Sequence, residues 1–351
     1  MESTLPALAV QCLDLPSVEQ LKAAVARGES ISSADPMLAR AELPLQQMFY
    51  PFGFPLQLLT NSPEILSIAG DCWHGFHPLF DMAPIRFQVG VTQGGPAKCP
   101  PAPSSRVREH ICSHVADSQN FAISDAAHAF TVAWFSETTL AHRDYIRYFM
   151  LESAAMFHLA ARYAIGIHAA CVASLGRGIL LSGDSGAGKS TLAYACARAG
   201  FTYVTDDASF LVNSREDSLI VGNSRMVRFR PSAESLFPEL RGRPMLRRAQ
   251  TGKPSIEWPT ASLAHIATAF STPVLHTVFL NRQPGLPQQL IPFPSDVARA
   301  FILQRGIGIA SVASLHTDAV DRLLTRGLFE LCYTDLDWAV VRLARLAQDG
   351  F

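Results

Sequence analysis

The residues whose types and spacing indicate chemistry begin at Gly183. From there the chain reads Gly-Asp-Ser-Gly-Ala-Gly-Lys-Ser-Thr, which contains the pattern G-x-x-x-x-G-K-S of phosphate-binding loops. In such a loop the glycines let backbone N–H groups turn toward a polyphosphate, and Lys189 reaches the β- and γ-phosphates. The Ser190 hydroxyl is a ligand for Mg²⁺. The predicted nucleotide-binding residues are Gly183, Asp184, Ser185, Gly186, Ala187, Gly188, Lys189, Ser190 and Thr191.

Two flanking elements must position this loop. Residues 178–182 are a short apolar run that predicts a buried strand. Residues 190–199 are rich in Ala and Leu and predict a helix, with Gly200 as its C-cap. A chance glycine-rich turn is the competing interpretation of the loop. The strand–loop–helix context favours phosphate binding over that alternative.

Two adjacent acids, Asp206 and Asp207, follow the apolar residues 201–204, seventeen positions after Lys189. That separation accommodates one helix and one returning strand, which would bring both carboxylates back beside the loop. One carboxylate can then hold Mg²⁺, and the other can accept a proton from an attacking hydroxyl. Taken alone, two aspartates are more often the start of a turn. The nearby phosphate-binding pattern reverses that preference.

Composition limits the possible classes of protein. The chain has 351 residues, which favours two domains, and it is 48% hydrophobic and 17% charged. Its net charge of −1 and the lack of a long basic run argue against nucleic-acid binding. Seven scattered cysteines without a C-x-x-C pair predict reduced thiols in a cytoplasmic protein. The first residues do not read as a signal peptide. No membrane span is expected, because the best candidate, residues 145–165, carries Arg147, Glu152, His158 and Arg162.

The elements in chain order predict an α/β catalytic domain within a chain that is α+β overall. Residues 1–150 read as a smaller N-terminal α+β domain with antiparallel strands, possible roles being acceptor binding or regulation. It includes a helix with a capping box at residues 17–20, a short helix over 36–42 and a strand over 107–114. A long helix is predicted over 143–163. Residues 151–351 form the second domain, in which a strand over 167–174 makes a hairpin with the strand before the loop.

These residues resemble the catalytic domain of HPr kinase/phosphorylase, which is related in fold to phosphoenolpyruvate carboxykinase. The resemblance covers residues 165–212 and rests on the loop, on Gly200-Phe201, on residues 204–207, and on Ile167-His168-Ala169 before the hairpin. Residues 228–231, 252–255 and 279–282 are similar to divergent HPr-kinase-related proteins that are often associated with peptide-modification clusters. A segment like that family's Glu-Ile-Arg-Gly-Leu-Gly signature is missing from the sequence. That departure argues against HPr as the acceptor and against phosphorolysis.

The resemblance implies a role for each matching residue. The loop backbone and Lys189 would hold the phosphates of ATP, and Ser190 and Asp207 would bind Mg²⁺. Asp206 would be the general base that deprotonates a serine-type hydroxyl. His168 would polarise or position the transferring phosphate, and a buried hairpin histidine bonded to the backbone is an equal alternative. The candidates for charge neutralisation or acceptor binding are Arg228, Arg230, Lys253 and Arg282, although each is more often a surface residue when taken alone.

The first hypothesis is therefore an ATP- and Mg²⁺-dependent kinase that phosphorylates a hydroxyl of a peptide, a protein or a small molecule. Two alternatives remain open at this point. One is a nucleotide-binding sensor or assembly protein without transfer activity, and the other is a metabolic enzyme closer to phosphoenolpyruvate carboxykinase. The resemblance also allows a homo-oligomer. Two further clusters, residues 72–77 and the set His110, Cys112 and His114, are interpreted as packing rather than as metal sites.

Overall fold

The computed structural model describes residues 17–28, 42–247, 254–282, 285, 287–304 and 312–349. The chain divides into two compact units, Met1–Ala41 and Glu42–Phe351. In the first unit, helix α1 (Val18–Ala26) begins after Ser17, whose hydroxyl accepts a hydrogen bond from the Gln20 N–H while the Gln20 side chain accepts one from the Ser17 N–H. The predicted capping box is thereby confirmed. Most of the helix predicted over 36–42 lies outside the described residues.

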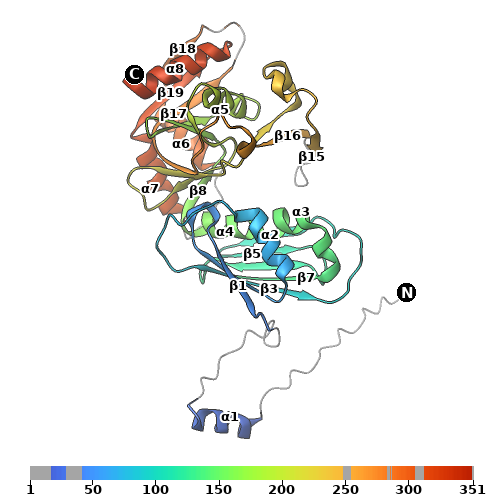
Figure 1. The fold of residues 1–351 in the computed structure, drawn as a ribbon. Helices are drawn as coiled ribbons and strands as arrows, with labels where there is room; N and C mark the ends of the chain where they lie inside the picture. The colour runs from blue at the N-terminus through green and yellow to red at the C-terminus, as the bar shows by residue number, and fades with distance from the viewer. Residues whose placement is uncertain are drawn as a thin grey trace, which may run out of the picture. The chain divides into compact units, whose positions relative to one another are not determined.

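The second unit begins with a mixed sheet and the helices that cover it (Figure 1). The strands are β1 (Leu45–Phe49), β2 (Leu56–Thr60), β3 (Ile85–Thr92), β4 (Ser104–Arg108), β5 (Ile111–Val115), β6 (Phe121–Asp125) and β7 (Phe130–Ser136). The helices are η1 (Pro51–Gly53), α2 (Pro63–Trp73), η2 (Glu137–Ala141), α3 (Arg143–Tyr145), the π-helix η3 (Ile146–Glu152) and α4 (Ser153–Arg162).

This first sheet has the strand order β1-β2-β3-β7-β6-β5-β4. Strands β2, β3 and β7 are parallel to one another, and the remaining pairs are antiparallel. The expectation of antiparallel strands was therefore confirmed for the other four strand pairs and wrong for the pairs β2–β3 and β3–β7, and α2 carries the chain across the sheet between β2 and β3. Alternate side chains of β3 are buried against the helices, namely Ile85, Phe87 and Val89. The same hydrophobic cluster includes Phe210 and Val221 of the second sheet, so one core joins the two sheets.

One local prediction in this region was wrong, and a second was confirmed except for its type of winding. The strand predicted over 107–114 is a hairpin of β4 and β5, and the chain reverses at Glu109, whose φ of 52° lies in the left-handed region. The long helix predicted over 143–163 is present as one helical run, but residues 146–152 of it are wound as a π-helix. That π-helix runs through residue 150, and the domain boundary predicted there stays a prediction.

The remaining elements build a second, larger sheet and a small third one. The strands are β8 (Ala164–Ile167), β9 (Ala170–Ser174), β10 (Arg177–Ser182), β11 (Thr202–Thr205), β12 (Ser209–Val212), β13 (Leu219–Gly222), β14 (Met226–Phe229), β15 (Met245–Arg247), β16 (Pro254–Pro259), β17 (Ser271–Asn281), β18 (Gln289–Pro292) and β19 (Gly327–Cys332). The helices are α5 (Lys189–Arg198), η4 (Pro231–Ser235), η5 (Pro238–Leu240), η6 (Thr260–Ser262), α6 (Ser295–Leu303), α7 (Ala313–Leu324) and α8 (Leu336–Asp349).

The main path of the second sheet runs β11-β9-β10-β17-β13-β12-β8, with β19 also paired to β17 and β18 paired to β19. Strand β10 is parallel to β17 and antiparallel to β9. Only His168 and Ala169 separate β8, at one end of this order, from β9, near the other end. Since two residues span a short distance, the sheet must curl so that its two ends approach. The single strand predicted over 167–174 was wrong for this reason.

Helices cover both faces of the second sheet, which explains why β10 is apolar along its whole length. Ile179 and Leu181 pack in the hydrophobic cluster that contains residues of α5 and α8. Leu180, between them, packs with Val320 and Leu323 of α7 on the opposite face. A strand that is buried on both faces has a continuous apolar sequence. Strand β10 therefore enters the loop from a fixed position at the centre of the sheet.

The third sheet has the order β14-β16-β15, and both of its strand pairs are antiparallel. Among the residues that the structure describes, no helix combines the length and the apolar character that crossing a membrane requires.

Candidate functional site

The loop of residues 183–188 connects the end of β10 at Ser182 to the start of α5 at Lys189. Gly183, Gly186 and Gly188 have φ angles of 139°, 95° and 97°. Residues other than glycine are strained at such positive φ angles. A Cβ on Gly188 would also lie 2.9 Å from the Tyr333 hydroxyl oxygen. The three glycines are therefore needed for the chain to turn between the predicted strand and the predicted helix, both of which are present.

Lys189 is buried and lies back over the loop. Its Nζ donates hydrogen bonds to the backbone carbonyls of Gly183, at 2.9 Å, and Asp184, at 3.1 Å. These bonds hold an ammonium group next to the N-terminus of α5, where the first turn of the helix exposes N–H groups and a partial positive charge. The arrangement concentrates positive potential at the mouth of the loop, as an anion site requires.

Ser190 connects α5 to the end of strand β11. Its hydroxyl donates a hydrogen bond to the backbone carbonyl of Asp206 at 3.2 Å. The Asp206 side chain is 2% exposed, and its carboxylate accepts a hydrogen bond from the Arg228 N–H at 2.8 Å. The predicted return strand therefore brings Asp206 and Asp207 beside the loop.

Asp207 contacts a residue from another strand end. Its Oδ1 lies 2.9 Å from His168 Nδ1, and the two side chains are 37% and 42% exposed. His168 lies in the two-residue connection between β8 and β9, so the curl of the sheet brings it to Asp207. His168 is therefore half-exposed and paired with a carboxylate, which differs from the buried hairpin histidine of the alternative interpretation.

The predicted basic residues have different environments. Burial disfavours the charge of Arg228, but the carboxylates of Asp206 and Glu257 outweigh it and raise the pKa of this guanidinium. Arg228 Nε lies 3.4 Å from Glu257 Oε1. Arg230 donates from Nη2 to the Ser185 hydroxyl at 3.0 Å, so it lies directly against the loop. Arg282 is exposed, and Lys253 lies outside the described residues.

A cavity of about 910 Å³ opens over the loop, and we call it the loop cavity. Its lining contains most of the predicted site residues, namely His168, Ser185, Gly186, Gly188, Lys189, Ser190, Thr191, Asp207, Arg228, Arg230 and Arg282. Gly183, Asp184 and Ala187 form the turn beneath it, and the Asp184 carbonyl accepts a hydrogen bond from the Ala187 N–H. The volume lies within the range of pockets for cofactors and small molecules.

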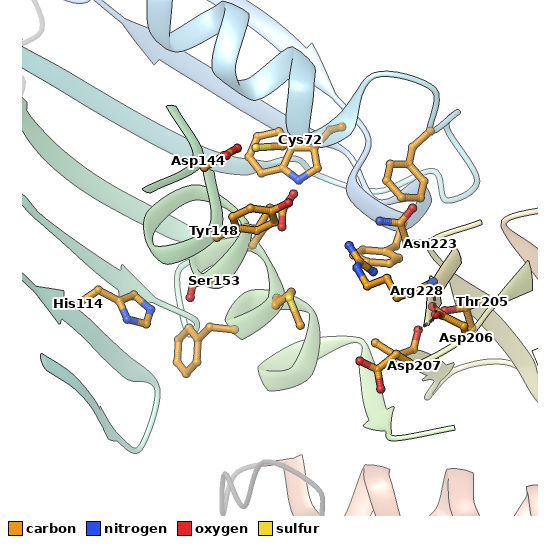
Figure 2. A pocket seen from close by; sticks show the side chains of 18 of the residues that line it. Cys72, His114, Asp144, Tyr148, Ser153, Thr205, Asp206, Asp207, Asn223 and Arg228 are labelled. Atoms are coloured by element: carbon orange, nitrogen blue, oxygen red, sulfur yellow. Dashed lines mark hydrogen bonds between the residues drawn. The ribbon is translucent and has the colours of Figure 1, made fainter. Parts of the chain in front are cut away.

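A second cavity, of about 600 Å³, lies between the helices of the first sheet and the end of β11, and we call it the aromatic cavity (Figure 2). Asp206, Asp207 and Arg228 gather at one end of the view, and His114 and Ser153 lie toward the other, with Tyr148 between them. Asp207 and Arg228 line both cavities. Asp206 lines the aromatic cavity but is not among the described residues that line the loop cavity.

The residues present fit Mg²⁺ as it is held in nucleotide sites. This ion takes one or two carboxylates and completes its shell with phosphate oxygens and water. Asp207 presents a half-exposed carboxylate to the loop cavity, and the Ser190 hydroxyl lies beside the Asp206 backbone. No group of three or more histidine, cysteine or acidic side chains suited to a metal occurs in the described part of the chain. An ion that relies mainly on substrate oxygens does not need such a group.

The sequence did not predict the aromatic cavity. Two clusters that contribute residues to it were interpreted as packing. Cys72 and Trp73 line it, whereas the neighbouring His74 and His77 are exposed. The Cys112 thiol lies 3.5 Å from His114 Nε2 on one strand face, while His110 lies in the turn, 4.0 Å from Asp125. The available signal was the pair of opposite charges, Arg147 and Glu152, in a mostly apolar helical stretch. A largely buried carboxylate needs a partner, and Glu152 pairs with Arg147 at 2.9 Å.

The comparisons with known proteins add little to this geometry. No family model matches the chain, and no curated protein matches it by sequence. One solved structure that the chain resembles is the Hpr(Ser) kinase/phosphatase from Coxiella burnetii, with 14% sequence identity and a TM-score of 0.29 over 53% of this chain and 99% of that chain. A likeness at this level neither supports nor excludes a shared activity. The chain is a mixed α/β protein with the loop and paired carboxylates described above.

Proposed function

We propose that the protein is an ATP- and Mg²⁺-dependent kinase that transfers the γ-phosphate to a hydroxyl group. The observation that carries this proposal is the hydrogen bond from Ser190 to the Asp206 backbone, which ties two carboxylates to the phosphate-binding pattern. A protein that only binds a nucleotide needs the loop but has no need of a buried carboxylate at its edge. Phosphoryl transfer needs both, because it requires charge stabilisation and a positioned acceptor.

The nucleotide occupies the loop cavity in this proposal. Backbone N–H groups of residues 183–188, the first turn of α5 and Lys189 bind the β- and γ-phosphates. Arg230, which contacts Ser185 of the loop, adds a second cation at the cavity edge. Ser190 and Asp207 hold Mg²⁺, which neutralises phosphate charge when it is bound. His168 holds the Asp207 carboxylate in place through its 2.9 Å contact.

The acceptor approaches from the aromatic cavity, on the side that Asp206 lines. Asp206 accepts the proton of the acceptor hydroxyl, whose oxygen forms a bond to the γ-phosphorus while the bond from that phosphorus to the bridging oxygen of ADP breaks. The Arg228 N–H holds the Asp206 carboxylate at 2.8 Å, so the base does not have to be ordered during the reaction. The Arg228 guanidinium lines both cavities and lies where the transferred charge passes.

The test measures three quantities on purified protein: affinity for Mg²⁺-ATP, release of labelled γ-phosphate to water, and its transfer to a panel of seryl peptides, sugars and apolar alcohols. In Asp206→Asn we expect transfer to fall by about 10²- to 10⁴-fold, the range for loss of a general base. The affinity for Mg²⁺-ATP should stay within about threefold of the wild-type value, since Asp206 faces the acceptor side.

The matched control is Asp217→Asn, which removes a carboxylate that pairs with Arg215 on the surface. It should leave all three quantities unchanged. Transfer that persists in Asp206→Asn at the wild-type rate would refute the assigned base. A wild-type protein that binds Mg²⁺-ATP tightly without hydrolysis or transfer would favour a nucleotide sensor, and one that does not bind ATP would end the proposal.

A further inference from the structure

The aromatic cavity adjoins the position where a phosphoryl group would be delivered. It meets the loop cavity at Asp207 and Arg228, and Asp206 lines it. Its volume of about 600 Å³ lies in the range of pockets that enclose most of a small ligand. What this cavity can hold therefore bears on the identity of the acceptor, provided that the proposed kinase activity is correct.

The walls of the cavity are largely apolar. The buried side chains of Trp73 and Phe76 come from the end of α2 and the turn after it, and Met156 comes from α4. Phe52 packs on Phe76 with 5.1 Å between ring centroids. An apolar ligand in this space gains free energy in proportion to the apolar surface that it removes from water. The cavity therefore favours an acceptor whose body is hydrophobic.

Two unfavourable backbone features build these walls. Tyr148 and Glu152 line the cavity from the π-helix, a rare form that occurs mostly at functional sites. Phe52 has φ 52° and ψ 29°, a left-handed conformation that is strained for an aromatic residue. Both features direct side chains to the same space. Their joint presence supports a ligand site over a packing defect.

The charges around the cavity limit the ligand class further. The carboxylates in the lining are Asp144, Glu152, Asp206, Asp207 and Glu257. Among the described lining residues Arg228 is the one cation, and it pairs with Glu257 at 3.4 Å. Burial lowers the pKa of His114, so its imidazole is neutral near pH 7. An acceptor with a phosphate or carboxylate would therefore enter a space whose described lining carries five carboxylates and one cation, and it would meet like charges there.

We propose that the phosphoryl acceptor is a small alcohol with an apolar body and no anionic group, which occupies the aromatic cavity with its hydroxyl at Asp206. The hydrophobic part lies between Trp73, Phe76 and Met156. A folded protein would instead need an exposed surface next to Asp206, and this residue is only 2% exposed, at one end of the cavity.

Binding of two matched probes tests the proposal without knowledge of the natural acceptor. Phenylpropanol and phenylpropanoate share one skeleton and differ in a hydroxymethyl group against a carboxylate. Saturation-transfer NMR with the full-length protein gives an affinity for each. We expect phenylpropanol to bind at least tenfold more tightly, and phenylpropanoate to show no measurable saturation.

Cavity-filling variants locate the probe. Met156→Trp and Val107→Trp enlarge lining side chains that are 38% and 51% exposed, so the added rings do not have to enter the core. Each should weaken phenylpropanol binding at least tenfold and leave the affinity for Mg²⁺-ATP unchanged. Val341→Trp, at an exposed position of α8 outside the cavity lining, is the control and should alter neither affinity. Circular dichroism verifies that each variant is folded.

The outcomes separate this inference from the proposed function. Equal binding of the two probes by the wild-type protein, or tighter binding of phenylpropanoate, would overturn the inference even if ATP binds and is hydrolysed. Phenylpropanol binding that survives both Met156→Trp and Val107→Trp would do the same. If the wild-type protein does not bind ATP, the proposed function is refuted, whatever the probes show.

Discussion

The loop cavity and the aromatic cavity share Asp207 and Arg228 but are built in different ways. The loop cavity takes its positive potential from one short stretch, in which backbone N–H groups, a helix terminus and Lys189 come from residues 183–191. The aromatic cavity combines side chains from α2, the π-helix, α4 and the third sheet, which are far apart in the chain.

The difference shows how one site can keep its chemistry while its specificity changes. Backbone groups bind a phosphate whatever the neighbouring side chains are, so the loop cavity depends on a few glycines and one lysine. The aromatic cavity depends on side-chain size and charge at many positions. Substitutions there would alter the choice of acceptor with little effect on the nucleotide. Two predictions examine this division, in addition to the tests of the two proposals, and a third concerns the stability of the helices that cover the first sheet.

The largest effect is expected at Lys189. In Lys189→Ala the phosphates lose a charged hydrogen-bond donor, which is worth about 1.5–3 kcal/mol, so affinity for Mg²⁺-ATP should fall by roughly 10- to 100-fold. Phenylpropanol binding should be unchanged, because Lys189 lines the loop cavity and belongs to the other side of the site. Calorimetric titration of both ligands measures this. Lys98→Ala, at an exposed lysine, is the control, and an ATP affinity that is equal in the two variants would contradict the role of the loop.

A smaller effect concerns stability at acid pH, through a buried histidine of α4 that contacts the first sheet. His158 of α4 is fully buried, with Nε2 at 2.8 Å from the Thr131 hydroxyl, and burial lowers its pKa to about 4. Arg162 acts in the same direction. In the unfolded chain a histidine has a pKa of about 6.5. The unfolded state therefore binds more protons between these values, and stability falls as pH drops from about 6.5 toward 4.

Urea unfolding at pH 7 and pH 4.5 measures this loss, of which His158 should account for about 2 kcal/mol. His158→Gln should be less stable at pH 7 but should show a correspondingly weaker pH dependence. The buried His114, His276 and His316, whose pKa values burial also lowers, add to the slope in the same direction. The exposed His265→Gln is the control. A pH dependence that His158→Gln leaves at the wild-type slope would show that this residue is already charged in the native state or does not couple to folding.

The smallest effect is expected at Arg230, which reaches the loop through the Ser185 hydroxyl. Arg230→Gln removes one exposed cation at the edge of the loop cavity, where solvent screens its charge. We expect affinity for Mg²⁺-ATP to fall by about three- to tenfold, with a weaker salt dependence than in the wild-type protein. Arg241→Gln, at an exposed arginine outside both cavity linings, should leave the affinity and its salt dependence unchanged.

The parts of the site that depend on contiguous residues could be predicted from the sequence. The strand before Gly183, the helix after it and the return of Asp206 and Asp207 follow from local pattern and chain length. The contact between His168 and Asp207 could not be predicted in this way, because it depends on the curl of the sheet. That curl follows from the strand order together with the two-residue connection between β8 and β9. No local pattern specifies that order, so the break between β8 and β9 was missed.

Other elements differ from the prediction because the residue types there do not indicate the backbone conformation that the chain adopts. Glu109 takes a left-handed turn that usually selects glycine or asparagine, so the β4–β5 hairpin looked like one strand. The π-helix carries ordinary helical residues, and its buried side chains pack in the same hydrophobic cluster as those of α2. The aromatic cavity could not be predicted from local sequence either, because its lining residues come together only when elements far apart in the chain pack.

The two-residue connection between β8 and β9 has a consequence for how this chain can change over generations. Surface loops usually accept insertions, since each added residue costs little loop entropy. Between Ile167 and Ala170 an added residue would lengthen the connection that carries His168 and would displace its imidazole from Asp207. We therefore expect this connection to tolerate length variation less well than the exposed loops, because its short length sets the spacing of the paired residues.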